Sequence, residues 1–300
     1  MAKDKTNSAI LIVLFAGILW SFGALVVRYI EDARSIPWQY LFFRGLTIFL
    51  LLNLYLFIKE GKSFVNNYKK IDLSVIIGGL GFATAFIGFI WSITHTSAAI
   101  TLMMLAAMPF MTAILGYIFL KEKISLTTFF SIIIAAVGIS FMAFNSSQVG
   151  TLFGLMLGLL SSLGFSIGSV SLRWNKRTPT FTTVSLAGLF CVIISFTALI
   201  ISEQSFFTTF KNSSLSALHG TLVCSGLILY SIGSKNLPAA DLTLLSLTEV
   251  LGGIFWVWLP IFGINEVPTA NTIIGGFIIT FAILFYSLNT KRNRRFIGLN

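Results

Sequence analysis

The chain has 300 residues, of which 56% are hydrophobic and 10% are charged, with a formal net charge of +10. Soluble domains carry about 25% charged residues, so this sequence has too few polar residues to cover a soluble globule and indicates a lipid bilayer as its surroundings. The basic residues lie in short clusters between apolar runs, a topology pattern that argues against nucleic acid as a partner.

Ten apolar runs are long enough for transmembrane helices, which need ~20 residues each. They are expected at residues 8–29, 36–58, 73–94, 98–120, 125–144, 150–172, 180–202, 214–233, 239–260 and 269–289. The first run is too long for the apolar core of a signal peptide, so we interpret it as a retained helix. None of the runs shows the two-residue alternation of membrane β-strands, which predicts an all-α polytopic membrane protein.

The distribution of Lys and Arg predicts the orientation of the helices. If the N-terminus is cytoplasmic, most of the basic residues fall in cytoplasmic segments, including the connection at 59–72. The exceptions are Arg28, Arg34 and Lys211 on the outer side and Arg44 within a run. By the positive-inside rule, both termini are therefore expected in the cytoplasm.

An internal repeat divides the chain into residues 1–147 and 148–300, with five apolar runs in each half. Short sequences recur in matching places: Trp91-Ser92-Ile93 with Tyr230-Ser231-Ile232, Ala98-Ala99 with Ala239-Ala240, and Glu122 with Glu266. Because each half has an odd number of runs, the halves are expected to insert with opposite orientations. Inverted repeats are typical of secondary transporters, whose substrate lies near the middle of the membrane between the halves.

Glu249 is the strongest candidate for a functional residue, because it lies midway along the run 239–260. An ionised side chain at that depth costs ~2.5–3.5 kcal/mol, so it should face a cavity or a partner. Ser246 and Trp256 share its helix face and are candidates for substrate contact. The alternative is a structural acid that is hydrogen-bonded to neighbouring helices.

Four other charged positions are also candidates. Arg44 is expected to form an ion pair, for which Glu249 is a possible partner, or a gate, and the alternatives are direct binding of a substrate carboxylate and snorkelling toward the outer surface. Asp241, at the start of its run, is interpreted as an acid stabilised by the helix dipole. Glu122 and Glu266 end matching runs, and they are either gate latches or ordinary loop charges.

Several uncharged residues complete the candidate site. Trp20 lies deep in the first run and is either a cavity wall or a core residue. A stripe of Thr84, Trp91 and His95 is either helix packing or the lining of a vestibule, and His95 is also a gate candidate. The remaining candidates are Met108 and Tyr230 for substrate contact and Pro109 for a helix kink.

A hydrolase is a remote alternative. Residues 164–168 spell G-x-S-x-G, and Ser166 could act with His95 or His219. That motif needs a strand–turn–helix context, whereas here it lies within an apolar run.

The sequence resembles the EamA family of the drug/metabolite transporter superfamily. The resemblance is carried by Ser97-Ala98-Ala99, Met108-Pro109-Phe110, Glu122 and the Arg44 of F-F-R-G. It implies a path enclosed by helices 1, 3, 4, 6, 8 and 9, and a place in the bacterial cytoplasmic (inner) membrane. Thr248-Glu249-Val250 departs from the Leu-Glu-Pro that second copies often carry, so no proline kink is expected there.

From these features we predict a secondary active transporter of a small polar or amphipathic metabolite, such as an amino acid or amine. Alternating access is expected, with proton coupling or exchange, and export is favoured over uptake. The predicted partners are a small-molecule substrate and the lipid bilayer, with a homodimer left open and no cofactor, metal or enzymatic activity. An uncoupled channel or facilitator is the alternative, and it would be unable to concentrate its substrate.

Overall fold

The computed structural model describes residues 2–143, 152–174 and 180–297, and every regular element in these ranges is helical. The helices of the first half are α1 (Ala2–Arg28), α2 (Pro37–Glu60), η1 (Gly61–Phe64), α3 (Val65–Tyr68), α4 (Leu73–His95), α5 (Ala98–Leu105), α6 (Met108–Leu115), η2 (Gly116–Leu120) and α7 (Leu126–Ala143). Those of the second half are α8 (Leu152–Trp174), α9 (Thr180–Ile201), α10 (Phe210–Gly233), α11 (Ala239–Ser246), α12 (Thr248–Trp258), η3 (Pro260–Phe262) and α13 (Ala270–Ile297).

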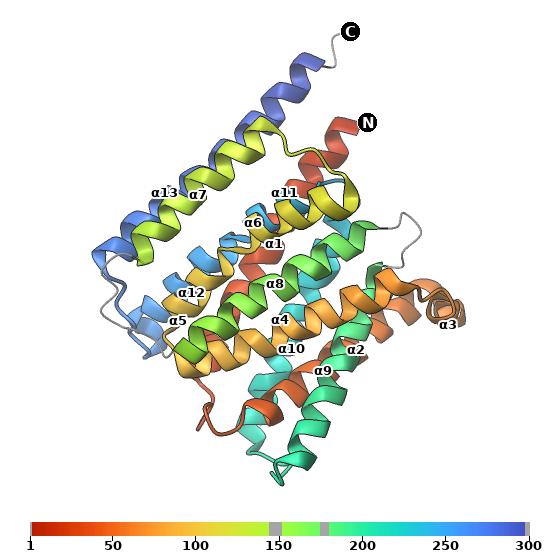
Figure 1. Cartoon of the computed structure of the whole chain (residues 1–300). Coiled ribbons are helices and arrows are strands. Elements are labelled where there is room, and N and C mark those ends of the chain that lie inside the picture. The colour runs from red at the N-terminus through yellow and green to blue at the C-terminus, as the bar shows by residue number, and fades with distance from the viewer. Residues whose placement is uncertain (1, 144–151, 175–179, 298–300) are drawn as a thin grey trace.

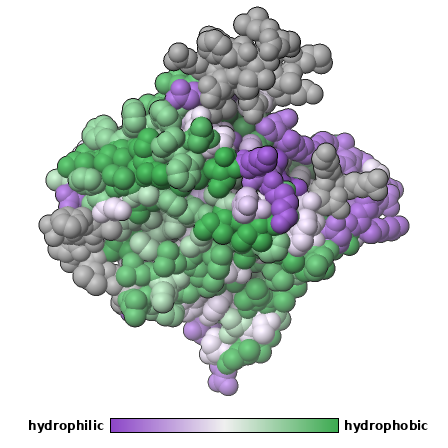
Figure 2. Space-filling view, turned by 45° about the horizontal axis from the view of Figure 1, so that its top comes forward, coloured by the Kyte–Doolittle hydropathy of each residue, from purple (hydrophilic) through white to green (hydrophobic). Residues whose placement is uncertain are grey.

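Eight helical stretches in the described ranges are long and apolar enough to cross a membrane, and two more apolar stretches, Leu126–Phe141 and Ile273–Asn289, are shorter. Apolar side chains cover much of the face seen in Figure 2, and polar ones gather at one edge of it. The expectation of an all-helical, multi-pass membrane protein is confirmed. The count of ten spans stays a prediction.

The helices of the two halves interleave in a regular way (Figure 1). The third long helix of the first half, α4, packs along the first helix of the second half, α8, and α10 packs along α1 in the reciprocal arrangement. Helices α7 and α13 lie side by side at one edge of the bundle. The main contacts between the halves therefore have counterparts in which the halves exchange roles.

Glycines bring α4 and α8 into backbone contact. A Cβ atom built on Gly164 would lie 2.6 Å from the carbonyl oxygen of Gly81, and one on Gly81 would lie 2.8 Å from the carbonyl oxygen of Gly164. Small residues at such crossings allow close packing of membrane helices. Gly164 of α8 and Gly81 of α4 therefore lie directly against each other where the two helices cross.

The expected helix at 98–120 is broken into α5 and α6 at Ala106 and Ala107, immediately before Met108 and Pro109. Proline has no N–H to donate to the preceding turn, and its ring clashes with that turn. The interruption therefore lies where the sequence places its proline.

The run expected at 239–260 is found as one apolar span, Ala239–Trp258, but it is not one continuous helix, because the chain is interrupted at Leu247, between α11 and α12. No proline lies there. Instead, the Thr248 hydroxyl lies 3.3 Å from the carbonyl oxygen of Leu14 and 3.1 Å from that of Leu245. Gly17 of α1 leaves space for the Thr248 side chain, since a Cβ on Gly17 would overlap it. The second break is therefore supported by contacts with a distant helix.

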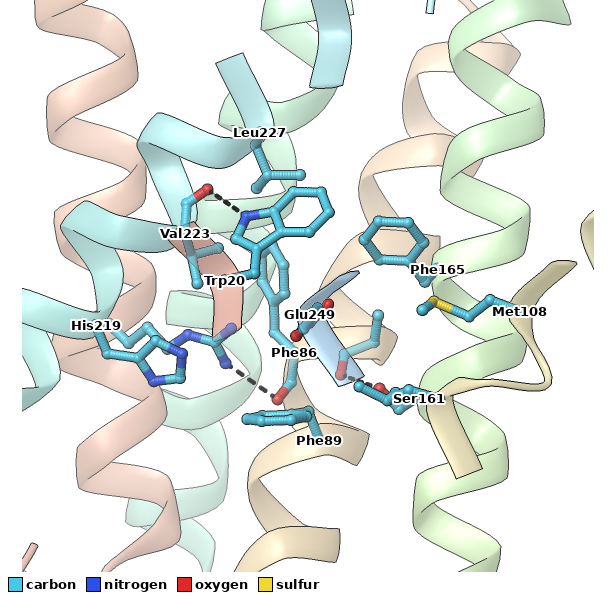
Figure 3. A pocket seen from close by; sticks show the side chains of 13 residues that line it. Trp20, Phe86, Phe89, Met108, Ser161, Phe165, His219, Val223, Leu227 and Glu249 are labelled. Atoms are coloured by element: carbon cyan, nitrogen blue, oxygen red, sulfur yellow. Dashed lines mark hydrogen bonds between the residues drawn. The ribbon is translucent and has the colours of Figure 1, made fainter. Parts of the chain in front are cut away.

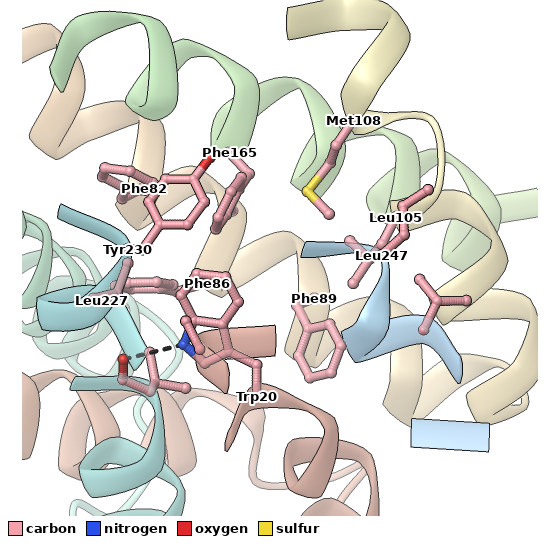
Figure 4. Packing of buried hydrophobic residues seen from close by; sticks show 14 of the residues in the cluster. Trp20, Phe82, Phe86, Phe89, Leu105, Met108, Phe165, Leu227, Tyr230 and Leu247 are labelled. Carbon is pink, nitrogen blue, oxygen red and sulfur yellow. Dashed lines mark hydrogen bonds between the residues drawn. The ribbon is translucent and has the colours of Figure 1, made fainter. Parts of the chain in front are cut away.

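Aromatic rings fill the centre of the bundle (Figure 4). Trp20 of α1 lies with its ring centroid 5.5 Å from that of Phe165 in α8 and 5.4 Å from that of Tyr230 in α10. Phe82 of α4 contacts Phe165 at 5.3 Å. These ring contacts join α1, α4, α8 and α10 around the middle of the chain's long helices.

Replacement of Gly164 by alanine should lower the melting temperature of the purified protein in detergent. The new methyl group would collide with the backbone of Gly81 and Ala85, and overpacking of this kind costs about 1–3 kcal/mol. Gly276→Ala is the control, because its Cβ would meet the Leu251 side chain at 3.6 Å, an ordinary contact. Equal melting temperatures for the two variants would contradict this account of the α4–α8 interface.

Candidate functional site

A small pocket, with a cavity volume of about 40 Å³, lies in the middle of the bundle. We call it the central pocket. It is lined by Trp20, Arg44, Ala85, Phe86, Phe89, Leu105, Met108, Ser161, Phe165, His219, Val223, Leu227 and Glu249. These residues come from α1, α2, α4, α5, α6, α8, α10 and α12, so both halves of the chain contribute.

Glu249 lies in the first turn of α12, directly after the break at Leu247, and lines the central pocket (Figure 3). Its side chain is half-buried, and its carboxylate has no hydrogen bond from any side chain or backbone group that the structure describes. The positive end of the α12 dipole stabilises a negative charge at this position. The acid is therefore held at the pocket wall with its oxygens left for a ligand.

Arg44 lines the same pocket from α2 and is only 4% exposed. Its guanidinium donates a hydrogen bond to the carbonyl oxygen of Phe86 at 3.4 Å and lies 4.9 Å from the centroid of the Phe86 ring. Its Nε has no hydrogen-bond partner. Arg44 and Glu249 form no ion pair within 4.0 Å, so the expected direct pairing is not formed here.

His219 was considered in the sequence only as a hydrolase partner, but it lines the central pocket from α10. It is 2% exposed, and its Nδ1 lies 2.5 Å from the Tyr40 hydroxyl. Phe86 and Phe89 of α4 form another part of the wall that sequence reasoning missed. All three residues lie within apolar runs without a motif, so no local signal marks them.

Two of the uncharged candidates from the sequence, Trp20 and Met108, line the central pocket. The indole N–H of Trp20 donates to the carbonyl oxygen of Val223 at 3.2 Å, which fixes the ring against α10. Tyr230 lies behind this ring and is bonded to Ser169 at 2.8 Å, so it supports the wall without lining the pocket.

The other candidates on helix faces are not brought to the pocket. The hydroxyl of Ser246 donates to the carbonyl oxygen of Thr243 in its own helix. Trp256 donates to the hydroxyl of Ser21 at 2.8 Å and stacks on Phe22. Thr84 faces α8, next to Gly164.

Trp91 and His95 lie together at the end of α4, away from the central pocket. Their rings stack at 5.4 Å, and Trp38 and Phe153 complete an aromatic cluster around Trp91. His95 Nδ1 lies 2.8 Å from the carbonyl oxygen of Trp91. The cluster therefore joins the ends of α2, α4 and α8.

Glu266 joins three segments at one end of the bundle, an arrangement that we call the Glu266 latch. Its carboxylate pairs with Nε of Arg28, at the end of α1, over 2.5 Å and accepts the backbone N–H of Ala98, at the start of α5, at 3.4 Å. Arg28 also donates to the carbonyl oxygen of Ile93 in α4 at 3.0 Å.

The same arrangement recurs around Glu122, which we call the Glu122 latch. Nε of Arg173, at the end of α8, lies 2.6 Å from the Glu122 carboxylate, which also accepts the backbone N–H of Ala239, at the start of α11, at 2.9 Å. Arg173 donates as well to the carbonyl oxygen of Ser234. The helical stretch Ala98–Leu120 separates the two latches, and its 23 residues span about 35 Å.

The G-x-S-x-G sequence lies inside α8, and the Ser166 hydroxyl donates to the carbonyl oxygen of Ser162 at 2.8 Å within that helix. Ser166 therefore lies within a helix, whereas a nucleophilic serine of this motif is exposed by a strand–turn–helix context.

Comparisons with known proteins agree with this architecture. The chain is 25% identical to an uncharacterized transporter of Helicobacter pylori J99 over 81% of its own length and 83% of that protein. It is 22% identical to the pseudopaline exporter CntI of Pseudomonas aeruginosa over 97% of its length and all of that protein. One crystal structure superposes with a TM-score of 0.75 at 17% identity, over 95% of this chain and 98% of that one.

One family model matches the first half of the sequence. Residues 7–144 match the EamA-like transporter family, and this region contains Arg44, Met108 and the Glu122 carboxylate described above. The first half of the chain is therefore similar to the EamA-like transporter family, and the relatives that align with most of the chain are transporters by name.

Proposed function

We propose that this protein is a secondary transporter that exports a small zwitterionic amino compound by alternating access. The observation that carries the proposal is the pair of opposite charges, Glu249 and Arg44, which line one pocket without forming an ion pair. A ligand that carries an ammonium group and a carboxylate satisfies both, since each forms charge-assisted hydrogen bonds with one side chain.

The walls of the central pocket suit the rest of such a ligand. Trp20, Phe86, Phe89 and Phe165 give it aromatic faces. Aromatic rings attract an ammonium group and also bury apolar side chains. An amino compound with an aliphatic or aromatic side chain fits this combination better than a sugar, which would need many more hydrogen-bonding groups.

Alternating access is supported by the two latches on opposite sides of the central pocket. In each latch, a glutamate from one half of the chain joins the end of a helix to the start of a broken helix, both from the other half: Glu266 binds Arg28 and Ala98, and Glu122 binds Arg173 and Ala239. We propose that one latch opens while the other stays closed. The reciprocal packing supports two inverted five-helix repeats, 1–147 and 148–300, in ten spans.

The distribution of basic residues supports a cytoplasmic location for both termini. In Figure 1 both ends of the chain and α3 lie toward one end of the bundle, which fits this orientation. On that basis the Glu122 latch closes the cytoplasmic side of the bacterial inner membrane, and the Glu266 latch closes the outer side.

Export is favoured by the relative from Pseudomonas aeruginosa, an exporter by name that aligns over its full length. Glu249 offers a site for either a proton or the ammonium group of a counter-substrate, so both proton coupling and exchange are compatible with the pocket. Two closed ends around one pocket favour a carrier over an uncoupled channel.

Transport in proteoliposomes should depend on both charges in a ligand-specific way. The probes are L-phenylalanine, phenethylamine, which lacks the carboxylate, and N-acetyl-phenylalanine, which lacks the ammonium group. Glu249→Gln should reduce the flux of phenylalanine and of the amine at least about tenfold, because a charged hydrogen bond contributes ~1.5–3 kcal/mol. Arg44→Gln should reduce only the flux of phenylalanine, and the wild-type protein should transport N-acetyl-phenylalanine poorly.

Glu203→Gln is the control, because Glu203 is exposed at the end of α9, away from the pocket. Its flux should equal that of the wild type. Wild-type flux of phenylalanine in Glu249→Gln, or an identical loss for every probe in both pocket variants, would contradict the assignment of one charge to each end of the ligand.

Opening either latch should expose the central pocket on one side. In a chain with Met108→Cys as a reporter inside the pocket, Glu122→Gln should speed labelling by a membrane-impermeant maleimide from the cytoplasmic side. Glu266→Gln should do so from the outer side, because each substitution removes the charge that holds its arginine.

Glu31→Gln breaks an ion pair with Lys211 whose two side chains are 53% and 54% exposed. Exposed pairs contribute little, so labelling should not change in this variant. Acceleration from both sides by a single latch variant would argue against separate gates.

A further inference from the structure

His219 lines the central pocket, where the proposed function uses only the charges of Glu249 and Arg44. It reaches the pocket from α10 (Figure 3) and is only 2% exposed. A buried polar ring in an apolar bundle needs hydrogen-bond partners for its nitrogen atoms. The two ring nitrogens of His219 have different surroundings, and this difference indicates what the ring can bind.

The first ring nitrogen, Nδ1, is bonded to Tyr40 of α2. The Tyr40 hydroxyl oxygen lies 2.5 Å from Nδ1, and the centroids of the two rings lie 5.9 Å apart. Tyr40 is 3% exposed, and within the described part of the chain its hydroxyl has no other hydrogen-bond partner. Because a buried hydroxyl hydrogen without an acceptor is costly, the Tyr40 hydroxyl donates to Nδ1.

This hydrogen bond determines where His219 carries its own proton. A ring whose Nδ1 accepts a hydrogen bond is neutral and holds its hydrogen on Nε2. Nε2–H is therefore a donor, and none of the described residues accepts a hydrogen bond from it. The Nε2 edge of the ring lies against Gly23 of α1, where a Cβ atom would lie 2.6 Å from Nε2. Tyr40 and Gly23 thus fix the position of the ring, and one donor remains for a ligand.

Arg44 lies on the same side of the central pocket as His219. Tyr40 and Arg44 are four residues apart in α2, so they share one face of that helix. The Phe89 ring of α4 packs against both: its centroid lies 6.0 Å from the guanidinium carbon of Arg44 and 6.1 Å from the centroid of the His219 ring. Nε of Arg44 also lacks a hydrogen-bond partner. This part of the pocket therefore offers N–H donors from two side chains.

We propose that His219 determines specificity for a carboxylate: its Nε2–H donates to one carboxylate oxygen of the ligand while Arg44 binds the other. Tyr40 is then a positioning residue, because it acts on the ligand only through the proton that it fixes on His219. A carboxylate accepts hydrogen bonds at both oxygens, so it can bind both side chains at once. This inference rests on the proposed function and names the groups that distinguish a carboxylate from a neutral end of the ligand.

The test is equilibrium binding to the full chain in nanodiscs, with L-phenylalanine in one arm and phenethylamine in the other. The readout is the selectivity ratio, which we define as the half-saturation concentration of the amine divided by that of phenylalanine. The wild type should have a ratio well above one. Partial unfolding of a variant lowers the number of sites equally in both arms, so the ratio reports on recognition of the carboxylate.

Two substitutions distinguish the two nitrogens of His219. The amide nitrogen of Gln can take the place of Nε2, whereas the shorter Asn reaches only the place of Nδ1. His219→Asn should therefore lower the selectivity ratio at least about fivefold, and His219→Gln should keep it within about twofold of the wild type, because only Gln retains the hydrogen bond to the charged ligand. Tyr40→Phe should also lower the ratio, because the ring is then free to carry its proton on Nδ1.

Tyr68→Phe is the matched control, because it removes a hydroxyl that is bonded to Asn53 and Ser185, outside the central pocket. Its selectivity ratio should equal that of the wild type. An unchanged ratio in His219→Asn, or equal losses in the Asn and Gln variants, would overturn this inference. The proposed function would still stand in that case if Arg44→Gln lowers the ratio. A wild-type ratio of one or less would overturn both proposals.

Discussion

The need to balance charge inside an apolar bundle governs this structure. Glu249 and Arg44 both lie within apolar helical stretches, and they share one pocket without an ion pair. Such groups are costly in a membrane unless they face a cavity or a partner. The α12 dipole partly compensates the charge of Glu249. The ring and the carbonyl oxygen of Phe86 partly compensate the charge of Arg44. A zwitterionic ligand would neutralise both side chains. The same two charges would therefore stabilise the occupied pocket and select its ligand.

Two broken helices position the residues of the central pocket and of the latches. The interruption at Leu247 puts Glu249 in the first turn of α12, and the interruption before Pro109 puts Met108 at the pocket wall. The same two helical stretches begin at the backbone N–H groups that Glu122 and Glu266 bind. The central pocket and the latches are thus parts of the same two elements, so movement of one half-helix can change both. This coupling supports the proposal of alternating access around a fixed site.

Much of this could be predicted from the sequence, because membrane helices are dictated by local hydropathy and mid-membrane charges by their cost. The cost of a buried charge identifies Glu249 and Arg44, which meet in one pocket with two uncharged candidates, Trp20 and Met108. The break at Leu247 was missed because it depends on Thr248 reaching α1 across the space left by Gly17, a tertiary contact without a local signal. His219 was not predicted as a pocket residue for the same reason, and Ser246 and Trp256 share a face with Glu249 in a straight helix that the break removes.

The central claim is that the two latches open in alternation around one loaded pocket. Distances between spin labels, measured by pulsed electron resonance in nanodiscs, test it most directly. One pair would be placed at the exposed positions Ser35 and Val267, beside the Glu266 latch, and another at Lys123 and Lys235, beside the Glu122 latch. Saturation with a transported amino acid should lengthen the distance at one end while the other end stays short or shortens. Simultaneous lengthening at both ends, or no change at either, would contradict the account.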